Sequence, residues 1–435
     1  MFLKVNSRKI PSHKDMSLNG PIVNALKPEY VYYPLHNKDV EYKKIVEVGS
    51  YVKMGQIILT RDDRFAHPIC SSVSGTVMGV KKMWHSSGQM VEMLEIQNDF
   101  KDDAIYTSST EFDFSKDEIV SKVKNAGIVG LGGAGFPTYV KYLPTQKANL
   151  IIINAVECEP YITCGYASIL EYSKTLIRGI KYIMKANGAK KAVIAIKKNY
   201  KDAIEVLKSE LTKHKNIKLH YFKDTYPSGW EKHVVESITK KTYSNLPREI
   251  KVVVNNTQTA IAVCEAVENN KPLIEKVITI TGEGIVEPKN FKVKIGTKLS
   301  TLISECGGYN PDIEEFHLIC GGPMTGKSIP NDELVITANV TGVVVLPKPE
   351  AVYSLNCIGC GKCSEFCPVK LTPTLIKQAY LNKNLEYLNM LNTTRCIGCG
   401  LCSYVCPSRV EISDYVYSAK DYVDSFAEIK STEKK

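Results

Sequence analysis

Two copies of one cysteine pattern decide the fold of the C-terminal part of the chain. The first copy is Cys357-Ile-Gly-Cys360-Gly-Lys-Cys363-Ser-Glu-Phe-Cys367-Pro368, and the second is Cys396-Ile-Gly-Cys399-Gly-Leu-Cys402-Ser-Tyr-Val-Cys406-Pro407. Together they hold eight of the 14 cysteines. Cysteines this closely spaced, in a chain whose start has no apolar leader, indicate metal binding rather than disulfides.

The spacing within each copy favours iron–sulfur clusters. Three thiolates two residues apart can surround one face of a cubane, and a fourth cysteine before proline binds the other cluster in two-cluster proteins. Two Cys₄ zinc sites are the alternative, which the repeated Cys-Pro ending disfavours. We therefore predict a helical ferredoxin domain over residues 351–425, followed by a lysine-rich tail at 426–435. We assign one [4Fe–4S] cluster to Cys357, Cys360, Cys363 and Cys406, and the other to Cys367, Cys396, Cys399 and Cys402.

The overall composition is that of a soluble protein with several domains. The 435 residues are 44% apolar and 23% charged, as is usual for packed globular chains. The formal net charge of +10 does not indicate nucleic-acid binding, because no basic patch interleaved with aromatics accompanies it. No apolar run approaches the roughly 20 residues of a membrane-spanning helix, and residues 1–11 are polar. We therefore expect no transmembrane segment and no signal peptide.

The N-terminal third is predicted to be mostly β structure. Prolines break residues 1–30, which we expect to be irregular. Residues 31–100 contain short alternating runs separated by glycines. Two stretches there, 46–56 and 68–77, resemble the hammerhead barrel of lipoyl and biotinyl domains. Those domains carry their cofactor on a hairpin lysine, but residues 61–65 contain none, so we expect a structural module.

The middle of the chain alternates between strand and helix patterns. The spacing predicts strands at 150–153, 192–196, 217–222 and 250–254, and helices at 169–185, 201–213, 230–238 and 257–267. This alternation is typical of a parallel sheet with helices on both faces, so we predict a Rossmann-like α/β domain over 112–270. Residues 272–346 are predicted to form a small α+β module. The expected fold class is multidomain α/β.

A glycine-rich loop is the candidate phosphate site of the α/β domain. Gly130-Leu-Gly132-Gly-Ala-Gly135 matches the spacing of a dinucleotide fingerprint. Glycine lets backbone amides approach a phosphate, the helix start beyond Pro137 adds a positive dipole, and Lys141 can add a full charge. The alternative is that these glycines only make turns. Asn154 follows the first predicted strand, with Glu157 and Glu159 close behind.

Segments along nearly the whole chain together resemble one family. They are Gly127-Ile-Val-Gly-Leu-Gly-Gly-Ala-Gly-Phe-Pro-Thr138, Asn154-Ala-Val-Glu-Cys-Glu-Pro160, Tyr226-Pro-Ser-Gly-Trp-Glu-Lys232, Val254-Asn-Asn-Thr-Gln-Thr259, Thr281-Gly-Glu-Gly284 and Gly321-Gly-Pro-Met-Thr-Gly326. With the twin cysteine motifs they resemble the RnfC (RsxC) subunits of Rnf electron-transport complexes. More distantly they resemble the flavin-bearing NADH subunit of respiratory complex I.

The resemblance implies cofactors and site residues. It implies that the module at 272–346 is a β-grasp domain of the SLBB type, and that FMN and NAD(H) bind the α/β domain. The residues implied to hold FMN are Gly130, Gly132, Gly133, Gly135, Lys141, Asn154, Glu157, Gly229, Asn255 and Asn256. Those implied to face the nicotinamide nucleotide are Phe136, Glu159, Glu231 and Lys232. The chain departs from the complex I pattern at Leu131, Val156 and Trp230.

The implied function is electron transfer between clusters, flavin and nicotinamide. Electrons pass between other Rnf-type subunits and NAD(H) through the two clusters and FMN, because FMN exchanges both single electrons and hydride. No catalytic acid or base is expected. The chain is expected to be a peripheral subunit at the cytoplasmic face of the cell membrane, held there by membrane-embedded and ferredoxin-like partners that couple the reaction to ion translocation.

Two other functions remain open from the sequence. Cobalamin reductases share the flavin loop and twin clusters, so the acceptor could be a cobalamin. An electron-relay or scaffold subunit with a degenerate flavin site is the second alternative, suggested by Val156 and Trp230. Assays of cobalamin reduction and of flavin content, respectively, separate these functions from the first.

Overall fold

The computed structural model describes residues 7–37, 40–109, 113–143, 147–349 and 354–432. The chain divides into two compact units. The larger unit comprises Ser12–Asp224 and Gly229–Lys348, and the smaller comprises Met1–Pro11, Thr225–Ser228 and Pro349–Lys435. The predicted β module, α/β domain and β-grasp domain fall in the larger unit, except for Thr225–Ser228 of the α/β domain. Both cysteine motifs fall in the smaller unit.

The β module of the larger unit is built from short strands around an apolar core. Its sheets have the strand orders β2-β10-β9-β6 and β5-β7-β8, beside a β3–β4 hairpin. The core side chains Val31, Ile58, Leu94 and Ile96 are fully buried. The strands are β2 (Tyr30–Pro34), β3 (His36–Asn37), β4 (Val40–Glu41), β5 (Lys43–Lys44), β6 (Tyr51–Val52), β7 (Ile57–Thr60), β8 (Ile69–Cys70), β9 (Gly75–Trp84) and β10 (Met90–Asn98).

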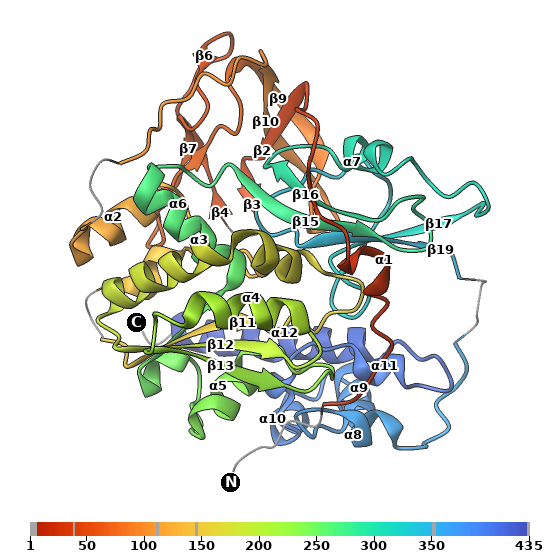
Figure 1. Cartoon of the computed structure of the whole chain (residues 1–435). Coiled ribbons are helices and arrows are strands. Elements are labelled where there is room, and N and C mark those ends of the chain that lie inside the picture. The colour runs from red at the N-terminus through yellow and green to blue at the C-terminus, as the bar shows by residue number, and fades with distance from the viewer. Residues whose placement is uncertain (1–6, 38–39, 110–112, 144–146, 350–353, 433–435) are drawn as a thin grey trace. The chain divides into compact units, whose positions relative to one another are not determined.

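The α/β domain contains a parallel sheet with helices on both faces (Figure 1). The strand order is β13-β12-β11-β14. Alternate residues of a strand face opposite sides. Ile151 and Ile153 accordingly pack in the core that contains the helices α3 (Cys164–Asn187), α4 (Lys201–Leu211) and α6 (Thr257–Asn269). Ile152 packs on the other face with α5 (Glu231–Thr239). The strands are β11 (Leu150–Ala155), β12 (Lys191–Lys197), β13 (Ile217–Phe222) and β14 (Val252–Asn256).

Two helices of this domain begin or end at residues that favour a helix terminus. Ser115 accepts the Glu118 amide, while the Glu118 carboxylate accepts the Ser115 amide, which together form a capping box. Gly188 ends α3 in the left-handed conformation. The helices are α2 (Lys116–Asn125), η1 (Thr138–Tyr142), α3 (Cys164–Asn187), α4 (Lys201–Leu211), α5 (Glu231–Thr239), η2 (Pro247–Ile250) and α6 (Thr257–Asn269). The predicted α/β alternation is confirmed.

The third part of the larger unit is a mixed sheet with one helix, α7 (Leu299–Glu305). The strand order is β1-β16-β15-β19-β17-β18. The strands are β1 (Ile22–Asn24), β15 (Glu275–Thr281), β16 (Lys289–Lys294), β17 (Phe316–Cys320), β18 (Lys327–Ile329) and β19 (Gly342–Pro347). The prediction that residues 1–30 are irregular is wrong for two segments. A short helix, α1 (Asp15–Leu18), precedes β1, and β1 pairs in parallel with β16 because Val23 adds to the apolar core of this sheet.

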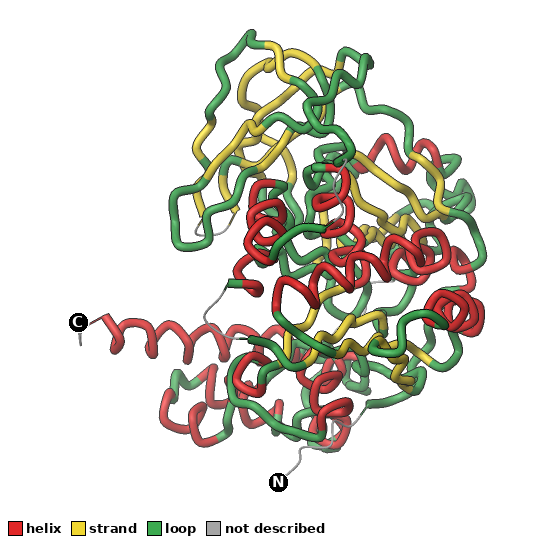
Figure 2. The backbone as a smooth tube through the Cα atoms, turned by 60° about the vertical axis from the view of Figure 1, so that its left-hand side comes forward, coloured by secondary structure: helices red, strands yellow, loops and turns green. Residues whose placement is uncertain are grey.

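The smaller unit is helical, as the apolar spacing predicts (Figure 2). Its buried residues include Ile376, Leu388, Val416 and Ala419. Its helices are α8 (Lys362–Phe366), α9 (Pro373–Leu381), α10 (Leu385–Met390), η3 (Thr393–Arg395), α11 (Leu401–Tyr404) and α12 (Ile412–Thr432). The prediction of a tail from residue 426 is wrong as far as Thr432, because α12 continues to that residue; residues 433–435 lie outside the described part.

Two separate segments complete the smaller unit. The backbone of Arg8 pairs with that of Tyr226. The Arg8 guanidinium also lies 4.6 Å from the ring centroid of Phe366 and 3.4 Å from the carboxylate of Glu365. Within the described residues, no helix is long and apolar enough to span a membrane.

Candidate functional site

The sheet topology of the α/β domain defines where a ligand would bind. β11 lies between β12 and β14, so the chain leaves β11 in one direction and later returns to its other side. In open α/β sheets, ligands bind at the carboxyl ends of the strands where this reversal occurs. The register places Asn154 beside Asn256 at this end of β11 and β14.

The glycine loop lies at the same end of the sheet. The Leu131 amide donates to Thr259 Oγ1 at 3.0 Å, which fixes the loop to the first turn of α6. A Cβ on Gly132 would lie 3.2 Å from Asn256 Nδ2. Gly135 has a φ of +62°, and a Cβ there would collide with Asn339. Glycine therefore lets the loop lie close to β14 at Gly132 and close to Asn339 at Gly135.

An unpaired amide lies at the carboxyl end of β14. The side chain of Asn255 is buried, and its Nδ2 has no hydrogen-bond partner within the described structure. Its Oδ1 accepts from the Tyr142 hydroxyl at 3.1 Å. A buried donor without a partner costs about 1–3 kcal/mol, so Asn255 fits an acceptor-rich ligand such as a flavin phosphate or ring carbonyl. Asn256 instead caps α6, its Oδ1 accepting the Gln258 amide at 2.9 Å.

Four more of the predicted residues lie at the carboxyl end of the parallel sheet. Lys141 Nζ donates to the Val254 carbonyl at 2.9 Å. Desolvation lowers the pKa of Lys141, and the Glu231 carboxylate opposes that change. Asn154 Nδ2 donates to the Gly229 carbonyl at 2.8 Å. The structure thus brings Lys141, Glu231, Asn154 and Gly229 to the end of the sheet that carries the glycine loop.

Glu157 has a structural role that the sequence did not reveal. Its carboxylate accepts the Gly165 amide at 2.6 Å at the start of α3. Lys14 Nζ, which is buried, lies 3.9 Å from the same carboxylate and donates to the Ile162 carbonyl. Desolvation lowers the pKa of Lys14, and Glu157 opposes this. Glu157 also has a φ of +40°, a conformation that is uncommon for residues other than glycine.

The residues predicted to face the nucleotide have other partners. Glu159 accepts the Met324 amide at 2.7 Å and the Thr325 amide at 3.1 Å. Burial raises its pKa, which these hydrogen bonds oppose. Lys232 Nζ lies 5.2 Å from the ring centroid of Tyr243. The Phe136 ring packs edge-on against the ring of Phe65, with 5.3 Å between the ring centroids. Phe65 belongs to the segment 61–65, which contains no lysine.

In the smaller unit, the four cysteines assigned to the second cluster line one cavity. They are Cys367, Cys396, Cys399 and Cys402. The amide of Leu371 donates to the first of these sulfurs at 3.2 Å, and the amide of Gly398 to the second at 3.4 Å. Burial raises the pKa of Cys399 and Cys402 to about 12, so a cationic metal core is needed to hold them as thiolates. This set of donors fits an iron–sulfur cluster.

The first set of cysteines is more open. Cys357 and Cys360 are exposed, Cys363 is buried and Cys406 is partly buried. The Cys406 sulfur accepts the Val410 amide at 3.4 Å. Across the described residues, no group of three or more His, Cys, Asp or Glu side chains is arranged to hold a single metal ion. The six cysteines outside the motifs are free thiols, and all but Cys158 are buried.

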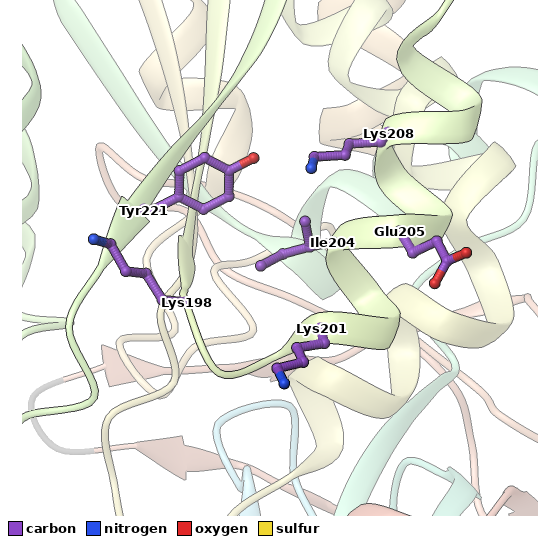
Figure 3. Close-up of a pocket in the computed structure, with 6 residues that line it drawn as sticks. All are labelled: Lys198, Lys201, Ile204, Glu205, Lys208 and Tyr221. Carbon is purple, nitrogen blue, oxygen red and sulfur yellow. The ribbon is translucent and has the colours of Figure 1, made fainter.

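A basic groove lies between α4 and the edge strand β13 (Figure 3). Its volume is about 570 Å³. It is lined by Lys198, Lys201, Ile204, Glu205, Lys208 and Tyr221. None of the predicted site residues lies in it.

Five residues of these sites were missed from the sequence. Lys14 lies in a segment that was expected to be irregular, and Tyr142 and Thr259 act through contacts between distant parts of the chain. Tyr417 and Lys420 donate to carbonyls of the second cysteine loop. Of these, only Thr259 stands in a segment used for the resemblance.

Comparison with known proteins identifies the family. Residues 8–101 match the family model of the RnfC barrel sandwich hybrid domain. The chain is 34% identical over 394 residues to a protein of the proton-translocating ferredoxin:NAD(+) oxidoreductase complex of Clostridium ljungdahlii, covering 87% of this chain and 85% of that protein. The chain belongs to the RnfC family. A second relative, from the Na(+)-translocating ferredoxin:NAD(+) oxidoreductase complex of Acetobacterium woodii, is 32% identical over 86% of each chain.

Other family models match the remaining domains of this RnfC-family chain. Residues 123–265 match the Nuo51 FMN-binding domain, 277–328 the SLBB domain and 356–410 the 4Fe-4S dicluster domain. The four-part fold expected from the sequence is thereby confirmed, with FMN and 4Fe–4S clusters as the cofactors of these domains. An NAD⁺-reducing [NiFe]-hydrogenase structure aligns with 72% of this chain and 61% of its own, at 18% identity and a TM-score of 0.48.

Proposed function

We propose that this chain is the nucleotide-facing subunit of a ferredoxin:NAD⁺ oxidoreductase complex. Electrons pass between a partner subunit and NAD(H) by way of two [4Fe–4S] clusters and FMN. One observation carries the proposal: the chain combines a glycine-lined site with an unpaired Asn255 amide and a separate cavity lined by four cysteines. The names of the two relatives agree with it.

Bound FMN supplies the conversion between two-electron hydride transfer and one-electron transfer. The chain's own residues would hold and orient the flavin. The loop that contains Gly132 offers backbone amides, Asn255 offers its free Nδ2, and Lys141 offers a positive charge at the same end of the sheet. Hydride moves directly between rings, so no side chain is needed as a catalytic acid or base.

The membrane location and the partner subunits of the chain belong to the same proposal. We place it as a peripheral subunit at the cytoplasmic face of the membrane, bound to membrane-embedded and ferredoxin-like subunits that couple electron transfer to ion translocation. The names of the two relatives, one proton-translocating and one Na⁺-translocating, support this coupling. We also propose that Phe136, Glu159, Glu231 and Lys232 approach NAD(H), which requires Glu159 to leave the Met324 and Thr325 amides.

Oxidation of NADH by the isolated chain tests this function. The cofactor-loaded protein, kept under argon, is mixed with NADH and a one-electron artificial acceptor, and NADH loss is followed by absorbance. We expect turnover that disappears when FMN is omitted. A Gly132→Val variant, whose side chain would meet Asn256, should lose FMN and activity together. Gly20→Val is the matched control, because Gly20 is exposed and its Cβ would meet only the Ser17 carbonyl oxygen, at 4.0 Å. Absence of turnover with both cofactors bound would contradict the proposal.

A further inference from the structure

Three side chains hold the loop of the second cysteine motif. The Tyr226 hydroxyl donates to the Cys399 carbonyl at 2.8 Å, and the Tyr417 hydroxyl donates to the Gly398 carbonyl at 3.0 Å. Lys420 Nζ donates to the Cys396 carbonyl at 3.1 Å. All three belong to the smaller unit. The loop that carries three ligands of the second cluster is thus fixed by two neutral donors and one cation.

The cation differs from the two phenols in its effect on redox chemistry. Reduction adds one negative charge to a [4Fe–4S] cluster, and its potential responds to nearby charge and hydrogen bonds. Lys420 contacts the backbone of a ligand residue and is only partly exposed. Its charge is therefore screened less than that of a lysine in open solvent. Such a charge stabilises the reduced cluster more than the oxidised one.

The two motifs share their sequence pattern, but in the part of the chain that the structure describes the first has no ammonium group held against its loop by a side-chain hydrogen bond such as that of Lys420. Its own Lys362, between Cys360 and Cys363, is exposed. Counted from the last cysteine of each motif, the positions of Tyr417 and Lys420 correspond to Gln378 and Leu381 in α9, and neither of these is charged. Along the described chain, no side chain donates a hydrogen bond to the carbonyls of Cys357 or Cys360.

The packing against the two loops differs in the same way. A Cβ on Gly359 would meet nothing within 4 Å, whereas one on Gly398 would collide with the Tyr417 hydroxyl. Residues 354–362 are exposed, but Gly398 is buried and the cysteines around it are partly buried. The duplicated sequence therefore provides two different environments, and only the second has an adjacent ammonium group held in place.

We propose that Lys420 is a positioning residue that raises the reduction potential of the cluster bound by Cys367, Cys396, Cys399 and Cys402, while the other cluster receives no comparable stabilisation. This inference rests on the cluster assignment in the proposed function. Its consequence is that an electron on this chain is drawn toward the second cluster. Tyr417 and Tyr226 fix the loop so that the ammonium stays beside it.

A redox titration followed by EPR tests the proposal on the full-length, cofactor-loaded chain with dithionite as reductant. Lys420→Gln removes the charge but keeps a donor for the Cys396 carbonyl, and Lys420→Arg keeps the charge. In Lys420→Gln we expect one of the two midpoint potentials to become more negative and the other to stay unchanged. Lys420→Arg should keep both midpoints near those of the unmodified chain.

The matched control removes a lysine from the same unit. Lys377 Nζ lies 4.4 Å from the ring centroid of Tyr415. Among the described residues it donates no hydrogen bond to either cysteine loop, so Lys377→Gln should leave both midpoints unchanged. Unchanged midpoints in Lys420→Gln at full iron content, or equal shifts of both, would overturn the inference. If Lys420→Gln lost iron while Lys420→Arg kept it, the redox titration would be repeated on the unmodified chain at increasing ionic strength. Because salt screens the Lys420 charge, the midpoint potential of the second cluster should then fall. A constant midpoint would overturn the inference. An unmodified chain without iron–sulfur signals would instead refute the proposed function.

Discussion

Asn255 provides a prediction in which protein stability and cofactor affinity respond differently to one change. Its Nδ2 is buried without a partner, and its Oδ1 accepts from the fully buried Tyr142 hydroxyl. Replacing Asn255 alone would leave that hydroxyl unpaired. The informative variant is therefore Tyr142→Phe together with Asn255→Leu, which removes both polar groups at once.

The magnitudes follow from hydrogen-bond energetics. Removing the unpaired amide recovers about 1–3 kcal/mol, and losing the Tyr142–Asn255 bond costs about 0.5–1.5 kcal/mol. The FMN-free double variant should therefore lie between about 0.5 kcal/mol less stable and about 2.5 kcal/mol more stable than the unmodified chain. A neutral hydrogen bond to FMN of about 0.5–1.5 kcal/mol corresponds to a Kd that is roughly 2- to 13-fold weaker without it.

The assay has two parts. Thermal unfolding of the FMN-free protein reports stability, and quenching of flavin fluorescence reports the Kd for FMN. Tyr142→Phe alone serves as the control, because it leaves the Asn255 amide in place and should keep FMN affinity. A double variant that binds FMN as tightly as the unmodified chain would refute the role of Asn255. One that unfolds at a clearly lower temperature would show that the amide is stabilised in the FMN-free protein.

Three further predictions concern other parts of the chain. Lys14→Met and Glu157→Gln should each destabilise the chain by about 3–5 kcal/mol by leaving a buried group unpaired. The double variant should lose much less than their sum in thermal melts; additive losses would contradict the pairing. Burial alone would raise the pKa of Glu275, but adjacent lysine ammoniums lower it to about 2 from 4.5. Its stabilisation is thus complete above pH 4.5 and is lost as pH falls toward 2. Glu275→Gln should remove about 3 kcal/mol of that acid dependence, and an unchanged acid melting curve would contradict the shift. Cys367→Ser and Cys406→Ser should abolish different EPR signals, since they are assigned to different clusters; loss of the same signal in both would contradict the assignment.

The spacing of apolar residues, together with capping residues and glycines at helix ends, was sufficient to predict the main elements of the fold. The run at 150–153 became β11, and Ser115 and Gly188 mark helix ends through local hydrogen bonds and backbone conformation. β1 was not predicted because it is only three residues long. It is a strand because of its pairing with the distant β16, which no local pattern encodes.

The candidate sites show the same division between local and long-range signals. The cysteine motifs are local, so Cys396 and Cys399 could be assigned from spacing, and Cys367 joins them in one cavity. Glu157 and Glu159 were also noticed, but their partners come from α3 and from residues 324–325, which sequence separation conceals. A lysine such as Lys420 has no signal of its own in a chain with 56 lysines and arginines.

Quantification of iron, zinc and flavin in anaerobically purified chain, together with its absorbance and EPR spectra, tests the central claim most directly. We predict one FMN and about eight iron atoms per chain, and EPR signals of two [4Fe–4S] clusters that appear when the protein is reduced. A colourless protein that contains zinc at the cysteine motifs and no flavin would contradict the account.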